Sequence, residues 1–343
     1  MEQVNWGIIG LGNIALKFSE NLVKHKNSRL FAIASKDKSK LDRFQNQFSI
    51  NSKKCFSNYE DLIDCKELDI IYIALPNALH FEWVKECINR KKNVLVEKPA
   101  TLNYSQAKTI NTLLEKKPVL FAEAMQYRYL PQTQKVINLL RDNTIGDLVS
   151  INSSFGSNLL SKKNIFGFEK EKKINIENRL FNKNLGGGAI LDLGCYPVSF
   201  SILIAALQNA DYEKIKINNK VVNKGAYEVD IDASLEIEFD TKFKAFISTS
   251  FKKDLGKKTE IIGKKGKITI EDTWHGGHSV TTLIEGVKKD LFINFEKNAY
   301  SYQIEAIEKM IIENKKVLDF PGMTIKDTLT NMKILDMWKN EHE

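Results

Sequence analysis

The chain has 343 residues, of which 43% are hydrophobic and 27% are charged, and its formal net charge is +8. This length exceeds what one hydrophobic core usually fills, so we expect two domains. The lysines alternate with acidic residues, as in Glu169-Lys170-Glu171-Lys172-Lys173, and the sequence has no zinc-finger, recognition-helix or RNA-binding motif. A solvated basic surface therefore explains the charge better than a nucleic-acid partner does.

The cysteines and the apolar segments indicate the cellular compartment of the protein. Four cysteines (Cys55, Cys65, Cys87 and Cys195) lack metal-ligand spacing and are too few for a disulfide scaffold in a chain of this length. We therefore expect a reducing, cytoplasmic location. No basic segment followed by an apolar stretch opens the sequence, so we expect no signal peptide. Because no apolar run reaches the ~18 residues of a membrane span, we expect no membrane partner.

Up to about residue 122, predicted strands and helices alternate, which is typical of parallel strands joined by helical crossovers. In the first helix we expect Ile14, Ala15, Phe18 and Leu22 to share the buried face. Asn103, with Gln106 three residues later, resembles a capping box that opens another helix. The sequence predicts a Rossmann domain over residues 1–122, with strands at 4–10, 29–35, 68–75, 93–96 and 119–124 and helices at 13–26, 38–48, 78–90 and 103–115.

Residues 123–343 have a different pattern. Apolar residues occupy alternate positions over 149–155, 229–239 and 243–251, which predicts long strands with one buried face. Turns are expected at Asp240-Thr241 and at residues 263–266. The polar segment 157–185 predicts a long loop near the mouth of the site. With helices at 131–141, 189–207, 301–313 and 325–340, the pattern predicts a second α/β domain with a large, mainly antiparallel open sheet.

The segment Gly10-Leu11-Gly12-Asn13-Ile14-Ala15 follows the first predicted strand. Gly10 would permit the tight turn, Gly12 would let the backbone approach a pyrophosphate, and Ala15 takes the place of the third glycine. The free amides at the start of the next helix favour phosphate charge. Such a motif alone could be an ordinary strand-to-helix turn, but its place after the first strand predicts a dinucleotide site.

The end of the second strand distinguishes NADP from NAD. An acidic residue there would bond the ribose 2′-hydroxyl and repel a 2′-phosphate. This sequence has Ser35-Lys36-Asp37. A hydroxyl beside a cation suits the 2′-phosphate, so we expect NADP to be preferred over NAD. Asp37 would favour NAD if the strand ended a residue or two later.

The strand 93–96 is followed by Glu97-Lys98-Pro99. Charged residues at the carboxyl edge of an open α/β sheet lie where such sheets bind ligands. A lysine there can stabilise the developing alkoxide of a substrate and favour the phenolate of a neighbouring tyrosine. Taken alone, Glu97-Lys98 could also be a surface ion pair.

The glycine motif, Pro76-Asn77-Ala78-Leu79-His80 and Glu97-Lys98-Pro99, in this order and spacing, resemble the Gfo/Idh/MocA oxidoreductases. The resemblance continues through residues 123–131 and 186–197, whereas residues 157–178 and those after 255 match loosely. It implies NAD(P)-dependent chemistry on sugars, inositols and related polyols, with Pro76, Asn77, His80 and Glu97 near the cofactor. It also implies a homodimer or homotetramer built through the C-terminal sheet.

Tyr196 stands where many members of this family carry histidine, and resembles the branch with dihydrodiol dehydrogenases, NADP-linked xylose dehydrogenases and glucose-fructose oxidoreductase. Asp192 lies four residues earlier and would share a helical face with Tyr196, although Pro197 argues for a kink. We expect Tyr196 to be the general acid/base, Lys98 to lower its pKa and Asp192 to orient its hydroxyl. Otherwise Tyr196 packs in the core and Asp192 caps a helix.

Several residues have two interpretations. Tyr127 and Arg128 could contact substrate or nicotinamide, or Arg128 could form a structural ion pair. Arg179 could line the substrate site. His80 could lie beside the cofactor or merely begin a helix. His275 and His278 have no third ligand nearby in the sequence, so we expect loop residues and no metal.

The sequence thus predicts a dehydrogenase or reductase that moves a hydride between nicotinamide C4 and a secondary hydroxyl or carbonyl of a sugar, polyol or dihydrodiol-like substrate, while Tyr196 handles the proton. Two alternatives stay open. One is a nicotinamide-binding regulator without turnover. The other is an oxidoreductase of nucleotide-linked sugars, in which Lys162, Lys163 and Arg179 would supply charge for a diphosphate.

Overall fold

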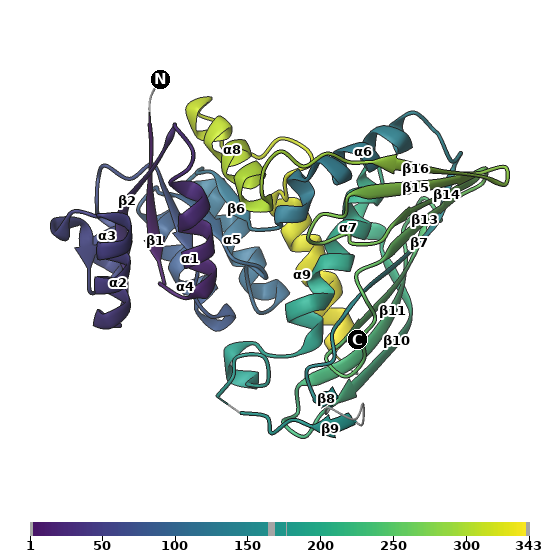
Figure 1. The fold of residues 1–343 in the computed structure, drawn as a ribbon, viewed down its shortest axis with the longest axis horizontal. Coiled ribbons are helices and arrows are strands. Elements are labelled where there is room, and N and C mark those ends of the chain that lie inside the picture. Colours follow the sequence, from purple (N-terminus) through teal and green to yellow (C-terminus); the bar gives the residue numbers. More distant parts are fainter. Residues whose placement is uncertain (1–2, 164–168, 176, 341–343) are drawn as a thin grey trace. The chain divides into compact units, whose positions relative to one another are not determined.

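The computed structural model describes residues 3–163, 169–175 and 177–340. The chain forms two compact units (Figure 1), each described by itself below. Unit 1 contains Met1–Tyr129 and Lys297–Leu329, and unit 2 contains Leu130–Glu296 and Thr330–Glu343. The sequence predicts one domain boundary, between residues 122 and 123. In the structure the chain crosses between the units more than once, because residues 297–329 belong to unit 1.

Unit 1 is built on a six-stranded sheet in which every neighbouring pair of strands is parallel. The strand order is β3-β2-β1-β4-β5-β6, so the order reverses between β1 and β4. In open α/β sheets, ligands bind beside such a reversal, at the carboxyl ends of the strands. The strands are β1 (Val4–Ile9), β2 (Ser28–Ala34), β3 (Cys55–Phe56), β4 (Ile70–Ile73), β5 (Asn93–Val96) and β6 (Phe121–Glu123).

Helices cover both faces of this sheet because alternate strand residues point to opposite sides. Trp6 and Ile8 of β1 pack in one core with α1 (Asn13–Leu22), α2 (Lys38–Phe48) and α8 (Ala299–Ile312). Ile9 packs in the other core with α3 (Tyr59–Ile63), α4 (His80–Asn89) and α5 (Tyr104–Lys116). The fold of this unit confirms the predicted Rossmann architecture.

Two local predictions for unit 1 have different outcomes. The capping of α5 is confirmed, because Asn103 Oδ1 accepts the Gln106 amide at 2.9 Å, while Gln106 Oε1 accepts the Leu102 amide at 3.0 Å. The predicted face of the first helix is wrong at one position. Ile14 is 36% exposed, whereas Ala15, Phe18 and Leu22 are fully buried, so the buried stripe of α1 runs through these three residues at spacings of three and four.

The helix α8 follows the strands of unit 2 in the sequence but packs in unit 1. Its buried Glu308 accepts hydrogen bonds from Trp6 Nε1, at 2.9 Å, and from the Ser28 hydroxyl. The indole and the hydroxyl satisfy a carboxylate that would otherwise be costly to bury. The expected assignment of this helix to the second domain is therefore not the one seen in the fold.

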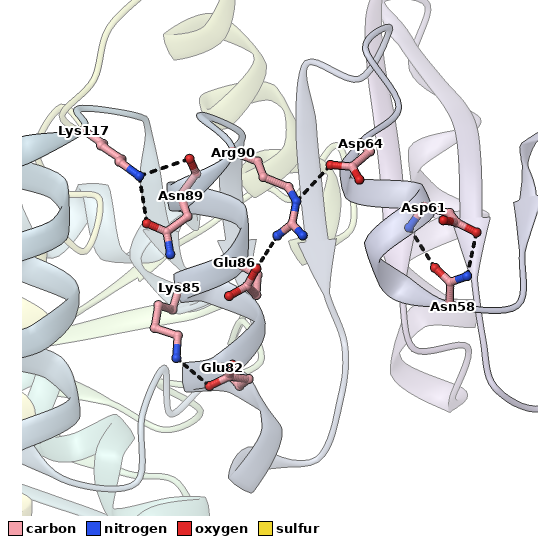
Figure 2. Close-up of polar contacts among 9 residues, drawn as sticks. All are labelled: Asn58, Asp61, Asp64, Glu82, Lys85, Glu86, Asn89, Arg90 and Lys117. Atoms are coloured by element: carbon pink, nitrogen blue, oxygen red, sulfur yellow. Dashed lines mark hydrogen bonds and ion pairs between the residues drawn. The ribbon is translucent and has the colours of Figure 1, made fainter.

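The outer surfaces of α3, α4 and α5 are linked by polar contacts (Figure 2). Arg90, at the end of α4, bonds Glu86 one turn earlier and reaches Asp64 Oδ1, at the end of α3, at 2.9 Å. Lys117, just after α5, donates to Asn89 Oδ1 at 2.9 Å. Exposed pairs of this kind contribute little individually to stability, and here they connect neighbouring helices on the surface of unit 1.

Unit 2 contains an eight-stranded sheet of order β10-β11-β12-β7-β13-β14-β15-β16. Its neighbouring strands are antiparallel except for the parallel pair β7 and β12, which confirms the expected mainly antiparallel sheet. The turns expected near Asp240 and at residues 263–266 each join two paired strands. The strands are β7 (Leu148–Gly156), β10 (Lys216–Lys224), β11 (Asp230–Glu238), β12 (Lys244–Ser250), β13 (Thr259–Gly263), β14 (Gly266–Ile270), β15 (Ser279–Ile284) and β16 (Val287–Phe292).

One face of this sheet carries the core of unit 2. The alternating residues of β11 and β12 are buried as predicted, among them Leu235, Ala245 and Ile247. Val149 differs from its prediction and is 44% exposed, since it lies at the end of β7. The helices of this unit are α6 (Pro131–Arg141), α7 (Cys195–Ala206) and most of α9 (Ile325–Lys339) (Figure 1).

The stretch Lys183–Ala206 has a mean hydropathy of 1.7 over its most apolar window and is long enough to cross a membrane. This finding differs from the expectation that no such run exists. However, 83% of that window is buried inside the protein, as is typical of the core helix of a globular unit.

The segment 157–185 is not the continuous loop that its composition predicts. Within it, β8 (Ser161–Lys163) and β9 (Glu169–Glu171) pair as an antiparallel ribbon, and Lys183–Leu185 forms a 3-10 turn. Backbone pairing of polar strands leaves no apolar alternation for the sequence to show. Residues 164–168 and 176, and the side chains of Lys162 and Lys163, lie outside the described part of the chain.

Candidate active site

The glycine loop after β1 has two glycines with different physical requirements. Gly10 has φ +89°, and a Cβ there would lie 2.7 Å from the Ala74 carbonyl oxygen, so the fold itself requires glycine. At Gly12, a Cβ would meet no described atom within 4 Å. The packing of the described chain thus does not demand glycine at position 12, whereas the close approach of a dinucleotide would.

Gly12 is also the N-cap of α1 and provides no side-chain cap. The amides of the first turn, which include those of Asn13 and Ile14, are donors that an α-helix does not satisfy internally. Ala15 is fully buried where this helix meets the sheet. These features fit the pyrophosphate of a dinucleotide, and this loop would hold it through backbone amides and the helix dipole.

The residues after β2 form the second part of this half-site. The Ser35 hydroxyl accepts the Asp37 amide at 3.1 Å, and Lys36 is exposed with its ammonium 5.5 Å from the Tyr59 ring centre. Asp37 is the N-cap of α2, where its carboxylate accepts the Ser39 and Lys40 amides. Hydrogen bonds from Ser39 and Lys40 lower the pKa of Asp37 to about 2. The Asp37 carboxylate therefore already accepts hydrogen bonds from the first turn of α2.

The ends of β4 and β5 carry the next two motifs. Pro76 precedes a 3-10 turn over Asn77–Leu79, in which Asn77 is 5% exposed. The Tyr72 hydroxyl donates to Glu97 Oε1 at 2.5 Å. Glu97 is thus held from β4, and Lys98 follows it directly at the carboxyl edge of the sheet.

The structure favours the second of the two interpretations of Arg128, a structural ion pair. It is 1% exposed, and its Nη1 lies 3.0 Å from Asp327 Oδ2 and 3.2 Å from the Pro321 carbonyl oxygen. The Tyr127 side chain is fully buried and bonds Arg128. Within unit 1, these contacts tie the segment after β6 to the first turn of α9 and to the segment that precedes it.

In unit 2, Asp192 and Tyr196 lie at a change of helix type. A π-helix covers Ile190–Gly194, and α7 begins at Cys195. Pro197 has no amide to donate to Leu193, so the regular α-helical ladder cannot extend back through this point. The single α-helix expected over 189–207 is therefore corrected, while the residues Asp192 and Tyr196 are still separated by roughly one turn. A π-turn of this kind is frequently found at functional sites.

The glycines before this helix have a close-packing explanation. A Cβ at Gly187 would lie 2.7 Å from the Leu180 carbonyl oxygen, and a Cβ at Gly188 (φ +115°) would overlap the Asp230 carboxylate. Asp230 Oδ2 accepts the Ile190 amide at 2.6 Å, so Asp230 caps the π-helix from β11. Sequence reasoning missed Asp230. Its only signal was an acidic residue at the start of an alternating apolar strand.

Asp192 has a cationic neighbour. Arg179 Nη1 lies 3.1 Å from Asp192 Oδ1, and the Asp192 side chain is 11% exposed while that of Arg179 is 47% exposed. The structure therefore brings together two of the predicted site residues of unit 2. A guanidinium beside this carboxylate favours its ionised form.

Aromatic side chains surround Tyr196. Its ring centre lies 5.3 Å from that of Phe155, edge to face, and 5.8 Å from that of Trp274. His275 lies 5.9 Å from Phe155 in a similar edge-to-face arrangement. The Trp274 indole donates to the Ser154 carbonyl oxygen at 3.2 Å. Phe155 and Trp274 were not predicted, because their places beside Tyr196 depend on strand pairing.

His275 and His278, the two histidines considered as metal ligands, each contact other side chains. His275 Nδ1 lies 3.5 Å from Asp272 Oδ1. The His278 ring stacks on Phe292 and lies edge to face with Phe295. In the part of the chain that the structure describes, no three His, Cys, Asp or Glu side chains gather as metal ligands would.

Comparisons with known proteins agree on a family. Residues 4–125 match the oxidoreductase family with an NAD-binding Rossmann fold, GFO_IDH_MocA, and residues 133–269 match the GFO/IDH/MocA C-terminal domain. A trans-1,2-dihydrobenzene-1,2-diol dehydrogenase of Xenopus tropicalis is 27% identical over 96% of both chains. A D-xylose 1-dehydrogenase (NADP(+)) of Haloferax volcanii is 27% identical, covering 69% of this chain and 70% of its own.

The fold has a solved counterpart. The aldose-aldose oxidoreductase of Caulobacter crescentus, solved with glycerol, superposes with a TM-score of 0.83 at 18% identity, covering 98% of this chain and 96% of that one. The glycine loop, the six-stranded parallel sheet and the two matched domains lead to one conclusion. The chain belongs to the Gfo/Idh/MocA family of NAD(P)-dependent oxidoreductases.

Proposed function

We propose that this protein is a dehydrogenase or reductase that interconverts a secondary hydroxyl and a carbonyl on a sugar, polyol or dihydrodiol-like substrate, with NADP as its preferred cofactor. The observation that carries the proposal is the placement of Tyr196 and Asp192 about one turn apart, with the tyrosine ring among Phe155 and Trp274. The nicotinamide, when bound, accepts or supplies the hydride at C4.

In the oxidation direction, the Tyr196 phenolate removes the proton from the substrate hydroxyl as the hydride leaves the same carbon. Lys98 donates a hydrogen bond to the substrate oxygen and stabilises its developing negative charge. Asp192, whose carboxylate lies 3.1 Å from Arg179, orients the Tyr196 hydroxyl. In the reduction direction, Tyr196 returns the proton to the carbonyl oxygen.

The relatives support a small cyclic substrate. Phe155 and Trp274, which are 8% and 3% exposed, pack beside the Tyr196 ring and hold it in place. The relatives named above are described as acting on a dihydrobenzenediol and on D-xylose, and both are small cyclic diols or polyols.

The preference for NADP rests on Ser35, Lys36 and Asp37. Lys36 is exposed, whereas Asp37, the acid that would favour NAD, caps α2. A cation next to a serine hydroxyl, which accepts the Asp37 amide and keeps its own proton to donate, suits a 2′-phosphate. The xylose dehydrogenase of Haloferax volcanii, which is described with NADP(+), supports the same assignment.

The test is turnover of NADP(H), and of NAD(H) in parallel, against aldoses, inositols, dicarbonyls, dihydrodiols and nucleotide sugars, with the oxidised cofactor for the alcohols and the reduced cofactor for the carbonyl compounds. Wild type should turn over at least one cyclic polyol or its ketone. Tyr196→Phe should lose at least about a hundredfold in kcat, with unchanged NADPH binding because the ring and its packing are kept. The control is Tyr212→Phe, which also removes one phenolic hydroxyl in unit 2.

The regulator alternative predicts a different outcome. Wild type and Tyr196→Phe would both bind NADPH, and neither would turn over any compound in the panel. Turnover of nucleotide sugars alone would instead support the second alternative, a reductase that needs charge for a diphosphate.

We also propose a cytoplasmic homodimer or homotetramer that assembles through the outer face of the unit 2 sheet. Three exposed apolar side chains point outward from this face: Val221 (52%), Phe246 (41%) and Phe292 (80%). Exposed apolar groups on a flat sheet favour burial against a second copy. Sedimentation of wild type should show a dimer or tetramer, and Phe246→Glu should shift it toward the monomer.

The proposed cytoplasmic location rests on the cysteines. All four cysteines are free thiols, which suits a reducing compartment.

A further inference from the structure

The His80 ring lies between two loops of unit 1. His80 begins α4 and is fully buried. Its Nδ1 is 2.8 Å from the Pro99 carbonyl oxygen, and its Nε2 is 2.7 Å from the Leu75 carbonyl oxygen. Leu75 follows β4 and Pro99 follows β5, so the ring links the ends of two neighbouring strands at the ligand-binding edge of the sheet.

Both of these contacts are with carbonyl oxygens, which only accept hydrogen bonds. A neutral imidazole carries one N–H, and its second nitrogen presents a lone pair. If His80 were neutral, one nitrogen would place its lone pair less than 3 Å from a carbonyl lone pair. The doubly protonated ring satisfies both carbonyls with donors.

The Pro99 carbonyl belongs to the same peptide group as the Ala100 amide. That amide donates to Glu123 Oε1 at 3.1 Å, and the Thr328 hydroxyl donates to Glu123 Oε2 at 2.7 Å. Glu123 is fully buried at the end of β6. One peptide group therefore lies between His80 on its carbonyl side and Glu123 on its amide side, and opposite charges on the two residues would polarise it in the same sense.

Burial and the surrounding groups decide whether these charges are tolerated. Burial raises the pKa of Glu123, and the hydrogen bonds from Thr328 and Ala100 and the nearby Arg128 oppose that effect. Burial and the start of α4 both disfavour a cation at His80, whereas the two carbonyl dipoles and Glu123 favour it. Within unit 1, the other titratable groups on α4 and on the segments packed against its first turns are Tyr72, Glu82, Lys85, Glu86, Cys87, Glu97, Lys98, Tyr104 and Lys108.

Most of these groups are already paired or lie on the surface of α5. Tyr72 bonds Glu97, and Lys85 bonds Glu82 at 2.9 Å on the outer side of α4 (Figure 2). Lys108 lies 4.8 Å from the Tyr104 ring centre. Lys98 directly precedes Pro99 in the chain, and its backbone carbonyl is part of the segment that His80 and Glu123 hold.

We propose that His80 is a permanently protonated imidazolium that, together with Glu123, clamps the Pro99–Ala100 peptide and so fixes the backbone that carries Lys98. His80 is then a positioning residue, because it acts through Lys98 and through the turn after β4. Its consequence for Lys98 rests on the proposed function, whereas its charge state does not depend on substrate or turnover.

The direct test is nitrogen NMR of the cofactor-free protein with labelled histidines. The chain has five histidines, and the His80 signals are assigned by their loss in His80→Gln, with free imidazole as the titrating reference. We expect both ring nitrogens of His80 to carry protons throughout the range from about pH 6 to about pH 8, where an ordinary histidine loses one. One unprotonated nitrogen at His80 at neutral pH would overturn the proposal.

A matched pair of variants tests the clamp itself. The amide nitrogen of His80→Asn takes the place of Nδ1 and can reach only Pro99, whereas that of His80→Gln takes the place of Nε2 and can reach only Leu75. Each should keep one link, weaken NADPH binding about tenfold and lower kcat, since a hydrogen bond from a charged donor is lost. Wild-type NADPH affinity and kcat in both variants would contradict the clamp.

A third variant tests the negative charge of Glu123. Glu123→Gln keeps the size of the side chain and removes its negative charge. In this variant His80 should begin to lose a proton below about pH 8, which the same NMR experiment measures. A His80 ring that stays fully protonated in Glu123→Gln would overturn the coupling between the two residues.

Discussion

The Arg179 guanidinium, on a segment of unit 2 that is polar and lysine-rich, lies 3.1 Å from the carboxylate of Asp192. Asp192 sits in a π-helix whose backbone geometry is set by Asp230 at one end and by Pro197 just beyond the other. The orientation of one proposed catalytic carboxylate thus depends on a half-exposed arginine, on a buried acid and on a proline.

Replacing Arg179 by glutamine should affect catalysis more than stability. The arginine side chain is 47% exposed, so solvent screens the pair and its loss should cost less than about 1 kcal/mol of folding free energy. The kcat/KM should fall about tenfold because Asp192 loses the group that orients it. Steady-state kinetics and thermal melting measure the two effects. Lys183→Gln is the control, since Lys183 forms only a 3.7 Å exposed pair with Glu228, and an equal loss in the control would refute the role of Arg179.

The two glycines of the loop after β1 should respond to alanine in opposite ways. Gly10→Ala must place a Cβ against Ala74 at positive φ, so the free energy of unfolding should fall by at least about 1–2 kcal/mol. Gly12→Ala has room and a permitted φ of −87°, so its stability should stay within about 1 kcal/mol of wild type. Its NADPH affinity should nevertheless fall tenfold or more, by about 1.4 kcal/mol or more. Denaturant unfolding and cofactor titration distinguish the two, and unchanged binding in Gly12→Ala would contradict the cofactor role of this loop.

Lys36→Glu should reverse or erase the preference for NADP. The ratio of kcat/KM for NADPH to that for NADH should fall by about tenfold or more, because a carboxylate repels the 2′-phosphate. Lys38→Glu makes the same change of charge two residues away, at a lysine that pairs with Asp42 on the outside of α2. A ratio that changes equally in both variants would show a general effect of charge rather than recognition by Lys36.

Asp272 should make the stability of the loop beside Tyr196 dependent on pH. Burial alone would raise the pKa of Asp272, but hydrogen bonds from His275 and Lys257 outweigh it and hold this pKa well below the ordinary value. A carboxyl with a depressed folded-state pKa contributes stability above its unfolded pKa of about 3.9, and loses it as the pH falls toward the folded value. Asp272→Asn should therefore melt below wild type at neutral pH, and the difference should shrink from about pH 5 to about pH 3.

The control for this prediction is the neighbouring Glu271, whose side chain is 70% exposed and lies 3.9 Å from Lys258. At neutral pH, Glu271→Gln should lower the melting temperature less than Asp272→Asn does. A difference for Asp272→Asn that grows on acidification would have the wrong sign and would exclude this interpretation.

Much of the fold could be predicted because its signals are local. The helices α2 and α6 and the strand β5 have the bounds expected from their periodicity, and the capping of α5 depends on two side chains only three residues apart. The motif residues after β1 and β5 were found for the same reason. What depended on distant pairing was not found: Glu308 bonds Trp6 across 302 positions of sequence, and Phe155 meets Tyr196 only after β7 has joined its sheet.

The candidate site shows the same division. Asp192 and Tyr196 are close in sequence and could be proposed together, but their π-helical setting depends on Asp230, nearly forty residues later in the chain. Arg128 was ambiguous because a buried ion pair and a ligand contact use the same side chain. Its burial and its contacts with Asp327, at 3.0 Å, and with the Pro321 carbonyl favour the structural role.

The return of α8 to unit 1 has a consequence for how the protein is made. During synthesis, the ribosome releases every strand of the parallel sheet before it releases Glu308, the acceptor for Trp6 and Ser28. The sheet of unit 1 must then wait, with part of one face uncovered, until nearly the whole polypeptide has emerged. A fragment that ends at Tyr129 would retain this exposed face, so a self-sufficient nucleotide-binding module cut from this protein would have to join residues 1–129 directly to 297–329.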